Sequence, residues 1–280
     1  MLLQRHHSCE SNGPFQSSPL DSTRPRPRVP LTIQKEIGWT PARPEGSPKA
    51  LNATPLEDDA TRRRLREGTL LAAWRADPPA GVTIRSDEEL EASLAGMLRD
   101  HDAGQDVHVF GYGSLMWNPA LEYTQALTAR LQGWHRRFCL RLLIARGSPD
   151  EPGVMCALDR GGACIGRVYR ISATKATEEL RLLWRREMLA GSYAARWVTV
   201  LADGRRLRAI TFVANRQHTR YVGGLPVEQI AHLVRTGKGA LGTSRAYFET
   251  MLLTLEGLAI RDAGMERLRV ALLRADGSTP

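Results

Sequence analysis

Glu187 interrupts the apolar face of a predicted helix that spans about residues 175–189. The apolar side chains of this face follow the helical spacing 0, 3, 4 and 8: Leu180, Leu183, Trp184 and Met188. Position 7 of the same face holds Glu187, and burial raises the pKa of an unpaired carboxylate into a range useful for proton transfer. The alternative is that Glu187 pairs with Arg185, Arg186 or another arginine at the edge of the face. The spacing supports both interpretations equally.

A second candidate is the glycine-rich turn after a short predicted strand at residues 107–110. The turn reads Phe110-Gly111-Tyr112-Gly113-Ser114-Leu115. Two glycines permit positive φ angles and close approach of a ligand to the backbone, and consecutive amide N–H groups in such a turn can bind an anion. A tight turn with a purely structural role fits these residues equally well.

Common nucleotide and hydrolase motifs do not fit this turn. A dinucleotide fingerprint needs glycine where Met116 stands, and a phosphate loop needs serine or threonine where Gly239 follows Gly-Lys. A nucleophile elbow around Ser114 needs glycine where Tyr112 stands. We therefore do not expect Ser114 to be a hydrolase nucleophile.

Metal sites and disulfides are not expected either. The histidines show no H-x-x-x-H spacing, and the four cysteines, Cys9, Cys139, Cys156 and Cys164, form no C-x-x-C pair. A disulfide framework is unusual in a chain long enough to bury a sizeable core. The sequence predicts reduced, mostly buried cysteines and no cofactor.

The elements that must position these residues form a mixed α+β pattern. Helices are expected at about 61–74, at 87–98 with Ser86 as N-cap, at 175–189, from Pro226 to Gly237 and at 243–260. Strands are expected at 107–110 and 139–143, in a hairpin of 154–158 with 164–171 around Gly161-Gly162, and in a hairpin of 197–201 with 209–213 around Asp203-Gly204. The pattern predicts one α+β domain with a curved or barrel-like sheet.

Residues 1–58 differ from the rest of the chain. They are proline-rich and lack apolar periodicity, so they cannot bury enough surface to offset the entropy of ordering. We interpret them as a disordered extension that is dispensable for stability and turnover. A transit peptide or an incorrectly assigned start codon remain alternatives.

Composition narrows the function classes. The 280 residues are 42% hydrophobic and 25% charged, as in globular proteins, and carry a net charge of +9. There is no 18-residue apolar run and no signal peptide, so we expect a cytoplasmic protein without a membrane partner. The arginines are scattered and the aromatics form no RNA-binding signature, so we expect no nucleic-acid partner.

Four sequence blocks together resemble the ChaC-like γ-glutamylcyclotransferases. The first is Val109-Phe-Gly-Tyr-Gly-Ser-Leu-Met-Trp-Asn-Pro119, and the second is Gly133-Trp134-His135-Arg136-Arg137-Phe138. The third is Leu183-Trp184-Arg185-Arg186-Glu187-Met188 with Gly191-Ser192-Tyr193, where many members have Gly-Gly-Tyr. The fourth is Gly237-Lys238-Gly239 and Leu241-Gly242-Thr243-Ser244 with Tyr247. The resemblance covers about residues 60–273.

The resemblance implies a small β-barrel with flanking helices and a cyclotransferase reaction. The α-amine of a γ-glutamyl group attacks its own γ-carbonyl, which releases 5-oxoproline and, from glutathione, cysteinylglycine. The implied domains are the extension at 1–58, a helical lead-in at 59–104 and a catalytic domain at 105–275. The protein is expected to be a monomer. Other γ-glutamyl amines as substrates, or a non-catalytic regulatory protein of the same fold, are the alternatives.

The resemblance also assigns roles to residues. Glu187 is the implied acid/base, which takes a proton from the attacking amine and gives it to the leaving nitrogen. The turn from Phe110 through Gly111, Tyr112, Gly113 and Ser114 to Leu115 is the implied substrate and oxyanion site. Tyr193 is expected to contact substrate, and Arg136 or Arg137 to bind a carboxylate.

Overall fold

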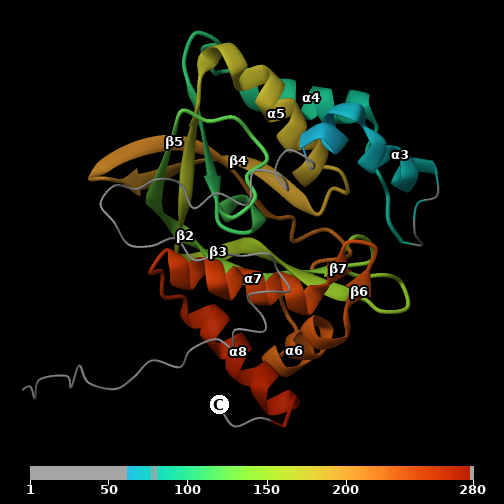
Figure 1. Ribbon diagram of the computed structural model, residues 1–280. Coiled ribbons are helices and arrows are strands. Elements are labelled where there is room, and N and C mark those ends of the chain that lie inside the picture. Colours follow the sequence, from blue (N-terminus) through green and yellow to red (C-terminus); the bar gives the residue numbers. More distant parts are fainter. Residues whose placement is uncertain (1–61, 77, 79–80, 278–280) are drawn as a thin grey trace, which may run out of the picture. The chain divides into compact units, whose positions relative to one another are not determined.

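The computed structural model describes residues 62–76, 78 and 81–277 (Figure 1). The predicted disordered extension at 1–58 therefore lies outside the described residues. Residues 62–67 are helical and precede the helices α3 (Thr69–Ala76) and α4 (Asp87–Leu98). The next elements are β1 (Val107–Gly111), the 3-10 turn η1 (Ser114–Met116), β2 (Gln125–Leu142), β3 (Gly153–Ile171), α5 (Ala173–Glu187), β4 (Tyr193–Ala202) and β5 (Arg205–Ala214). The chain continues through α6 (Val227–Thr236), the short pair β6 (Lys238–Gly239) and β7 (Gly242–Thr243), α7 (Ser244–Gly257) and α8 (Ala263–Ala275).

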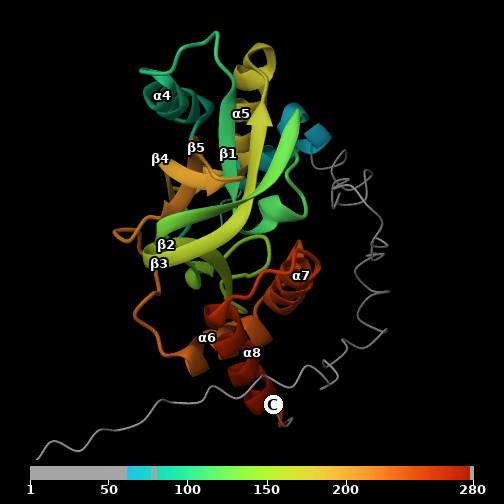
Figure 2. The same cartoon turned by 90° about the vertical axis from the view of Figure 1, so that its left-hand side faces the viewer.

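Five strands close into a barrel in the order β1-β3-β2-β4-β5. Each strand in this order pairs antiparallel with the next one. A parallel bridge between Val109 and Ile210 joins β1 to β5 and closes the barrel. Helices α4 and α5 lie on one side of the barrel and α6, α7 and α8 on the other (Figures 1 and 2). The expected α+β fold, a small β-barrel with flanking helices, is confirmed.

The strands β2 and β3 are much longer than the sequence predicted. The hairpin expected around Gly161-Gly162 is wrong, because β3 runs without a turn from Gly153 to Ile171 and pairs along its length with β2. The two glycines have positive φ angles of 101° and 66° and sit opposite Gly133, where the register shifts. They form a bulge with one extra residue, which bends the long ribbon instead of reversing it (Figure 2).

Local turn and cap signals predicted other elements correctly. Asp203 and Gly204 have φ angles of 46° and 73° and connect β4 to β5 in a two-residue hairpin. Ser86 caps α4 in a capping box with Glu89, as the residue types favour. The helix α8, capped by Asp262, was not predicted, although Asp262 accepts hydrogen bonds from the amides of Gly264 and Met265.

Two groups of buried apolar side chains hold these layers together. One joins strand residues such as Phe110 and Leu158 to α6, α7 and α8, and the other joins residues such as Val109 and Phe212 to α4 and α5. Because α5 packs against the second group through Leu180, Leu183 and Trp184, its last residue is carried to the end of the barrel where β1 ends. That end holds the predicted site.

Candidate functional site

The residues singled out in the sequence converge at the end of the barrel where β1 ends and β4 begins. A cavity of about 320 Å³ there is lined in part by Ser114, Glu187, Tyr193 and Tyr247. A much smaller inner recess of about 10 Å³ shares these four residues and adds Tyr112, Gly113 and Leu115. The outer volume is at the lower end of the range of small-molecule pockets, about 300–1,000 Å³. The four shared residues therefore mark the junction between a deep recess and a ligand-sized chamber.

Glu187 is the last residue of α5, and its side chain is 12% exposed. Burial raises the pKa of its carboxyl, and the nearby Arg186 guanidinium partly offsets this effect. The Arg186 Nε lies 3.1 Å from Glu187 Oε1. A carboxylate at the C-terminal end of a helix also faces the negative end of the helix dipole. The two interpretations of the sequence thus combine, because Glu187 is both buried with a raised pKa and next to an arginine.

Arg186 connects the helix to the glycine-rich turn. Its Nη2 donates to Ser114 Oγ over 2.9 Å, and its Nη1 donates to the carbonyl of Asn118 over 2.8 Å. A planar guanidinium with several fixed donors is well suited to hold two segments in register. The position of Glu187 relative to the turn is therefore set by its neighbour in the sequence.

Close packing excludes a Cβ at Gly111 and leaves little room for one at Gly113. A Cβ on Gly111 would lie 2.7 Å from the Cβ of Leu115, and one on Gly113 would lie 3.3 Å from the hydroxyl oxygen of Tyr247. Neither glycine uses the positive φ angles that glycine permits, because Gly113 has φ −120° and Gly111 is also outside the left-handed region. Close approach, and not a left-handed backbone, is the reason for glycine here.

A buried arginine supports the turn from below. Arg136 is 2% exposed and donates from Nε to the carbonyl of Tyr112 over 2.7 Å and from Nη2 to the carbonyl of Ile165 over 2.7 Å. Its Nη1 bonds to Asp262 Oδ2 over 2.5 Å, and Asp262 is the cap of α8. Arg136 therefore joins the turn, the barrel and the last helix, and does not line the cavity.

Three buried tyrosines surround the carboxyl of Glu187. The hydroxyl of Tyr112 donates to the carbonyl of Phe212 over 2.6 Å, and that of Tyr193 donates to the carbonyl of Cys156 over 2.7 Å. Burial raises the phenol pKa of Tyr112, Tyr193 and Tyr247 well above its usual value, so all three stay neutral. Tyr247 lies at the junction of recess and chamber.

The structure brings together most of the predicted site residues, but not all. Ser114, Glu187 and Tyr193 line both cavities, and Tyr112, Gly113 and Leu115 line the recess. Phe110 is fully buried in the core, and Gly111 packs against Leu115 behind the turn.

The arginines of the chamber were not those expected. Arg136 is enclosed, and Arg137 bonds to Asp159 over 3.3 Å outside the cavity lining. The chamber wall instead includes Arg146, Arg185, Arg186 and Arg220. Adjacency to Glu187 was a usable signal for Arg185 and Arg186, whereas nothing in the local sequence of Arg146 or Arg220 indicated a site.

Cys156 lines the inner recess, but the described cysteines are not placed to react. Cys139, Cys156 and Cys164 are free and buried, and burial raises the thiol pKa of Cys139 to about 12 and that of Cys164 to about 11. Such thiols are inert. Within residues 62–76, 78 and 81–277 there is no group of three or more histidine, cysteine or acidic side chains placed to hold a metal ion. No helix in the same part of the chain is long and apolar enough to cross a membrane.

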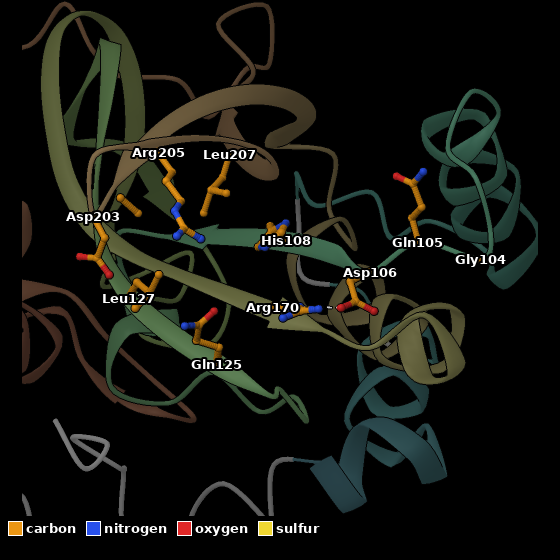
Figure 3. Close-up of a pocket in the computed structure, with 11 residues that line it drawn as sticks. Gly104, Gln105, Asp106, His108, Gln125, Leu127, Arg170, Asp203, Arg205 and Leu207 are labelled. Atoms are coloured by element: carbon orange, nitrogen blue, oxygen red, sulfur yellow. Dashed lines mark hydrogen bonds and ion pairs between the residues drawn. The ribbon is translucent and has the colours of Figure 1, made fainter. Parts of the chain in front are cut away.

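A larger hollow of about 840 Å³ lies at the opposite end of the barrel (Figure 3). It is bordered by the beginnings of β1 and β2, the end of β3 and the turn between β4 and β5. Figure 3 shows Arg170 bonded to Asp106, with His108 and Arg205 facing the same space. None of the predicted site residues borders it.

Known proteins resemble this chain in sequence and in fold. Residues 107–275 match the family model described as ChaC-like protein. A protein of Escherichia coli K12 named glutathione-specific gamma-glutamylcyclotransferase is 42% identical over 188 residues, which are 67% of this chain and 81% of that protein. The human glutathione-specific gamma-glutamylcyclotransferase 1 is 32% identical over 148 residues, 51% of this chain and 67% of that protein.

Solved structures of known proteins are also similar to this chain in fold. The crystal structure of a yeast gamma-glutamyl cyclotransferase specific to glutathione aligns with a TM-score of 0.57 at 21% identity, over 61% of this chain and 96% of that one. At this identity the likeness concerns the fold. The resemblance inferred from the four sequence blocks is confirmed by the family match.

Proposed function

The chain belongs to the ChaC-like protein family, and we propose that it is a glutathione-specific γ-glutamylcyclotransferase. In the proposed reaction the α-amine nitrogen of the γ-glutamyl group bonds to the γ-carbonyl carbon, and the amide bond to the cysteinyl nitrogen breaks. The products are 5-oxoproline and cysteinylglycine, and no water is consumed. Ring closure is intramolecular, so holding the substrate in a bent conformation supplies much of the rate.

Glu187 carries the proposal, because its buried carboxyl with a raised pKa lies where recess and chamber meet. The α-amine arrives mostly as an ammonium ion and must lose a proton before it attacks. In the proposal, the Glu187 carboxylate accepts this proton and later returns it to the leaving nitrogen. A raised pKa brings the carboxyl closer to the operating pH, which is where a proton shuttle is most effective.

Developing negative charge on the γ-carbonyl oxygen needs hydrogen-bond donors. Within the turn, the amides of Met116, Trp117 and Asn118 donate to backbone carbonyls of Gly113 and Ser114. The amides of Ser114 and Leu115 begin η1, where a helix has no internal acceptors for its first N–H groups. These amides are the proposed oxyanion donors.

The charge of the chamber supports an acidic substrate. Among the residues that the structure describes, its charged lining consists of four arginines and Glu187. Glutathione carries two carboxylates, and arginine is the residue best suited to bind a carboxylate with two hydrogen bonds. The proposal describes a cytoplasmic monomer that acts on a small molecule, without a nucleic-acid or membrane partner.

A direct assay tests the proposal. Purified protein is incubated with glutathione, and 5-oxoproline and cysteinylglycine are quantified. The proposal expects equal molar amounts of both, and a higher kcat/KM for glutathione than for γ-glutamylalanine. Equal values for the two substrates would favour a cyclotransferase of broader range, and no product from either would favour a non-catalytic binding protein of this fold.

A further inference from the structure

A short helix outside the matched family region is held against α5 by a buried ion pair. Arg62, in the helix of residues 62–67, is 8% exposed and forms a bidentate salt bridge with Glu179 of α5. Its Nη1 donates to Glu179 Oε2 over 2.6 Å, and its Nη2 donates to Oε1 over 2.8 Å. The side chain of Glu179 is fully buried. A buried charge without its partner is strongly unfavourable, so this pair fixes the short helix on α5.

Glu179, the α5 residue of this ion pair, lies about two helical turns before Glu187. Glu179 also accepts a hydrogen bond from the amide of Glu122 over 2.8 Å, which fastens the segment that follows η1. Glu187 follows Glu179 by eight positions along α5, so the helix of residues 62–67 can run beside α5 towards the cavity.

Leu65 reaches the chamber from this short helix. Its side chain is 1% exposed and lines the cavity of about 320 Å³. Its carbonyl accepts a hydrogen bond from Arg185 Nη1 over 3.2 Å, and Arg185 lines the same cavity. Leu65 does not line the inner recess. The short helix thus forms part of the wall of the chamber and not of the reaction centre.

We propose that Leu65 is a specificity-determining residue, and that the helix of residues 62–67 is the wall of the compartment that receives the leaving amine. This inference rests on the proposed function. The reacting γ-glutamyl head must lie at Glu187 and the turn, where recess and chamber meet, so the rest of the substrate extends into the chamber. There it meets the apolar Leu65, whose size limits how bulky the leaving group can be.

Substitutions at Leu65 test the inference through substrate selectivity. Leu65→Trp fills the chamber, and we expect kcat/KM for glutathione to fall about 10-fold or more, mainly through KM, while the value for the shorter γ-glutamylalanine changes less than about 3-fold. Leu65→Ala removes an apolar contact and is expected to raise KM for glutathione by roughly 5- to 10-fold with little change in kcat. Leu272→Ala, at a buried leucine of α8 away from the cavity, is the matched control and should leave the selectivity ratio unchanged.

A second measurement keeps the inference separate from the proposed function. Calorimetry compares the binding of glutathione to Glu187→Gln and to the double variant with Leu65→Trp, so turnover is not needed. If the wild type releases no 5-oxoproline, the proposed function fails, and weaker binding by the double variant still supports the wall. Equal binding by both, no binding by either, or equal losses for both substrates in folded Leu65→Trp would overturn the inference.

Discussion

The two ends of the barrel differ in how their charged groups are held. At the end near Glu187, a cavity of about 320 Å³ encloses a carboxyl whose pKa is raised by burial. At the other end, a hollow of about 840 Å³ is bordered by Arg170 and Asp106, which are bonded to each other and half or partly exposed (Figure 3). Hydrogen bonds from the amide of Ala173 and from Arg170 keep the pKa of Asp106 below its usual value.

The proposed chemistry lies at the smaller of the two cavities, so the proposal does not follow from volume. The larger hollow holds charges that are satisfied by each other and by solvent, and such exposed pairs contribute about 0–1 kcal/mol. The smaller cavity holds the Glu187 carboxyl, whose charged form is disfavoured by burial. It lies next to a turn that has no room for a Cβ at Gly111. A costly arrangement of this kind persists where function requires it.

Replacing the carboxyl of Glu187 should have the largest effect on activity. Glu187→Gln keeps the size of the side chain and its ability to form hydrogen bonds but cannot accept a proton. We expect kcat for glutathione to fall by about 10²–10⁴-fold, with substrate affinity nearly unchanged and no loss of melting temperature. If Glu187 served only as a partner of Arg186, the same variant would lose stability and keep its kcat. Measuring kcat, affinity and melting temperature on one preparation separates these patterns.

Replacing Arg136 should have the next largest effect, because Arg136 supports the glycine-rich turn near Glu187 without lining the cavity. Arg136→Met leaves Asp262 without its arginine and frees the carbonyl of Tyr112. We expect a loss of about 3–5 kcal/mol in the free energy of unfolding and a lower kcat in the protein that remains folded. Denaturant unfolding and steady-state kinetics check both. Arg136→Lys retains the charge without the planar fork and should fall between the wild type and Arg136→Met; a methionine variant as stable and active as wild type would contradict the assignment.

The pH dependence sharpens the contrast further. Burial raises the pKa of Glu187 from its ordinary value of 4.5, and the carboxylate is the form that accepts a proton. We expect kcat/KM to decline about tenfold per pH unit as the pH falls below the raised pKa.

A raised carboxyl pKa stabilises the folded protein at low pH, and this stability is lost as the pH rises from 4.5 through the raised pKa. Melting curves of the wild type and Glu187→Gln should therefore diverge in that window, with the glutamine variant gaining relative stability at higher pH; parallel curves would speak against the raised pKa.

The opposite end of the barrel should respond least. Arg205 and Gln125 border the larger hollow and are exposed. Alanine at either position is expected to change the free energy of unfolding by no more than about 0.5 kcal/mol and to leave kcat and KM for glutathione unchanged. Chemical denaturation and the glutathione assay provide the check. A severalfold loss of activity would show that the two ends are coupled and would break the comparison.

Local patterns in the sequence determined several elements before any contact was known. Asp203-Gly204 predicted its hairpin, because both residues tolerate the positive φ angles that a two-residue turn needs. Ser86 predicted the start of α4, because its side-chain oxygen can accept a hydrogen bond from the amide of Glu89. Helical spacing likewise placed Glu187 on the face that meets the core, since it follows residues such as Leu183 on one side of α5. In each case the interacting groups lie within a few residues of each other.

Tertiary structure alone decided the features that depend on distant partners. Gly161-Gly162 resembles a hairpin turn, but β2 supplies Gly133 opposite it, and the ribbon bends instead of reversing. Arg136 is locked by Asp262, which lies 126 residues away, and Leu65 reaches the chamber because Arg62 pairs with Glu179, 117 residues away. Long side chains such as arginine find their partners only when the chain has folded, so residue type and spacing indicate that they are present but not which carboxylate or carbonyl they bind.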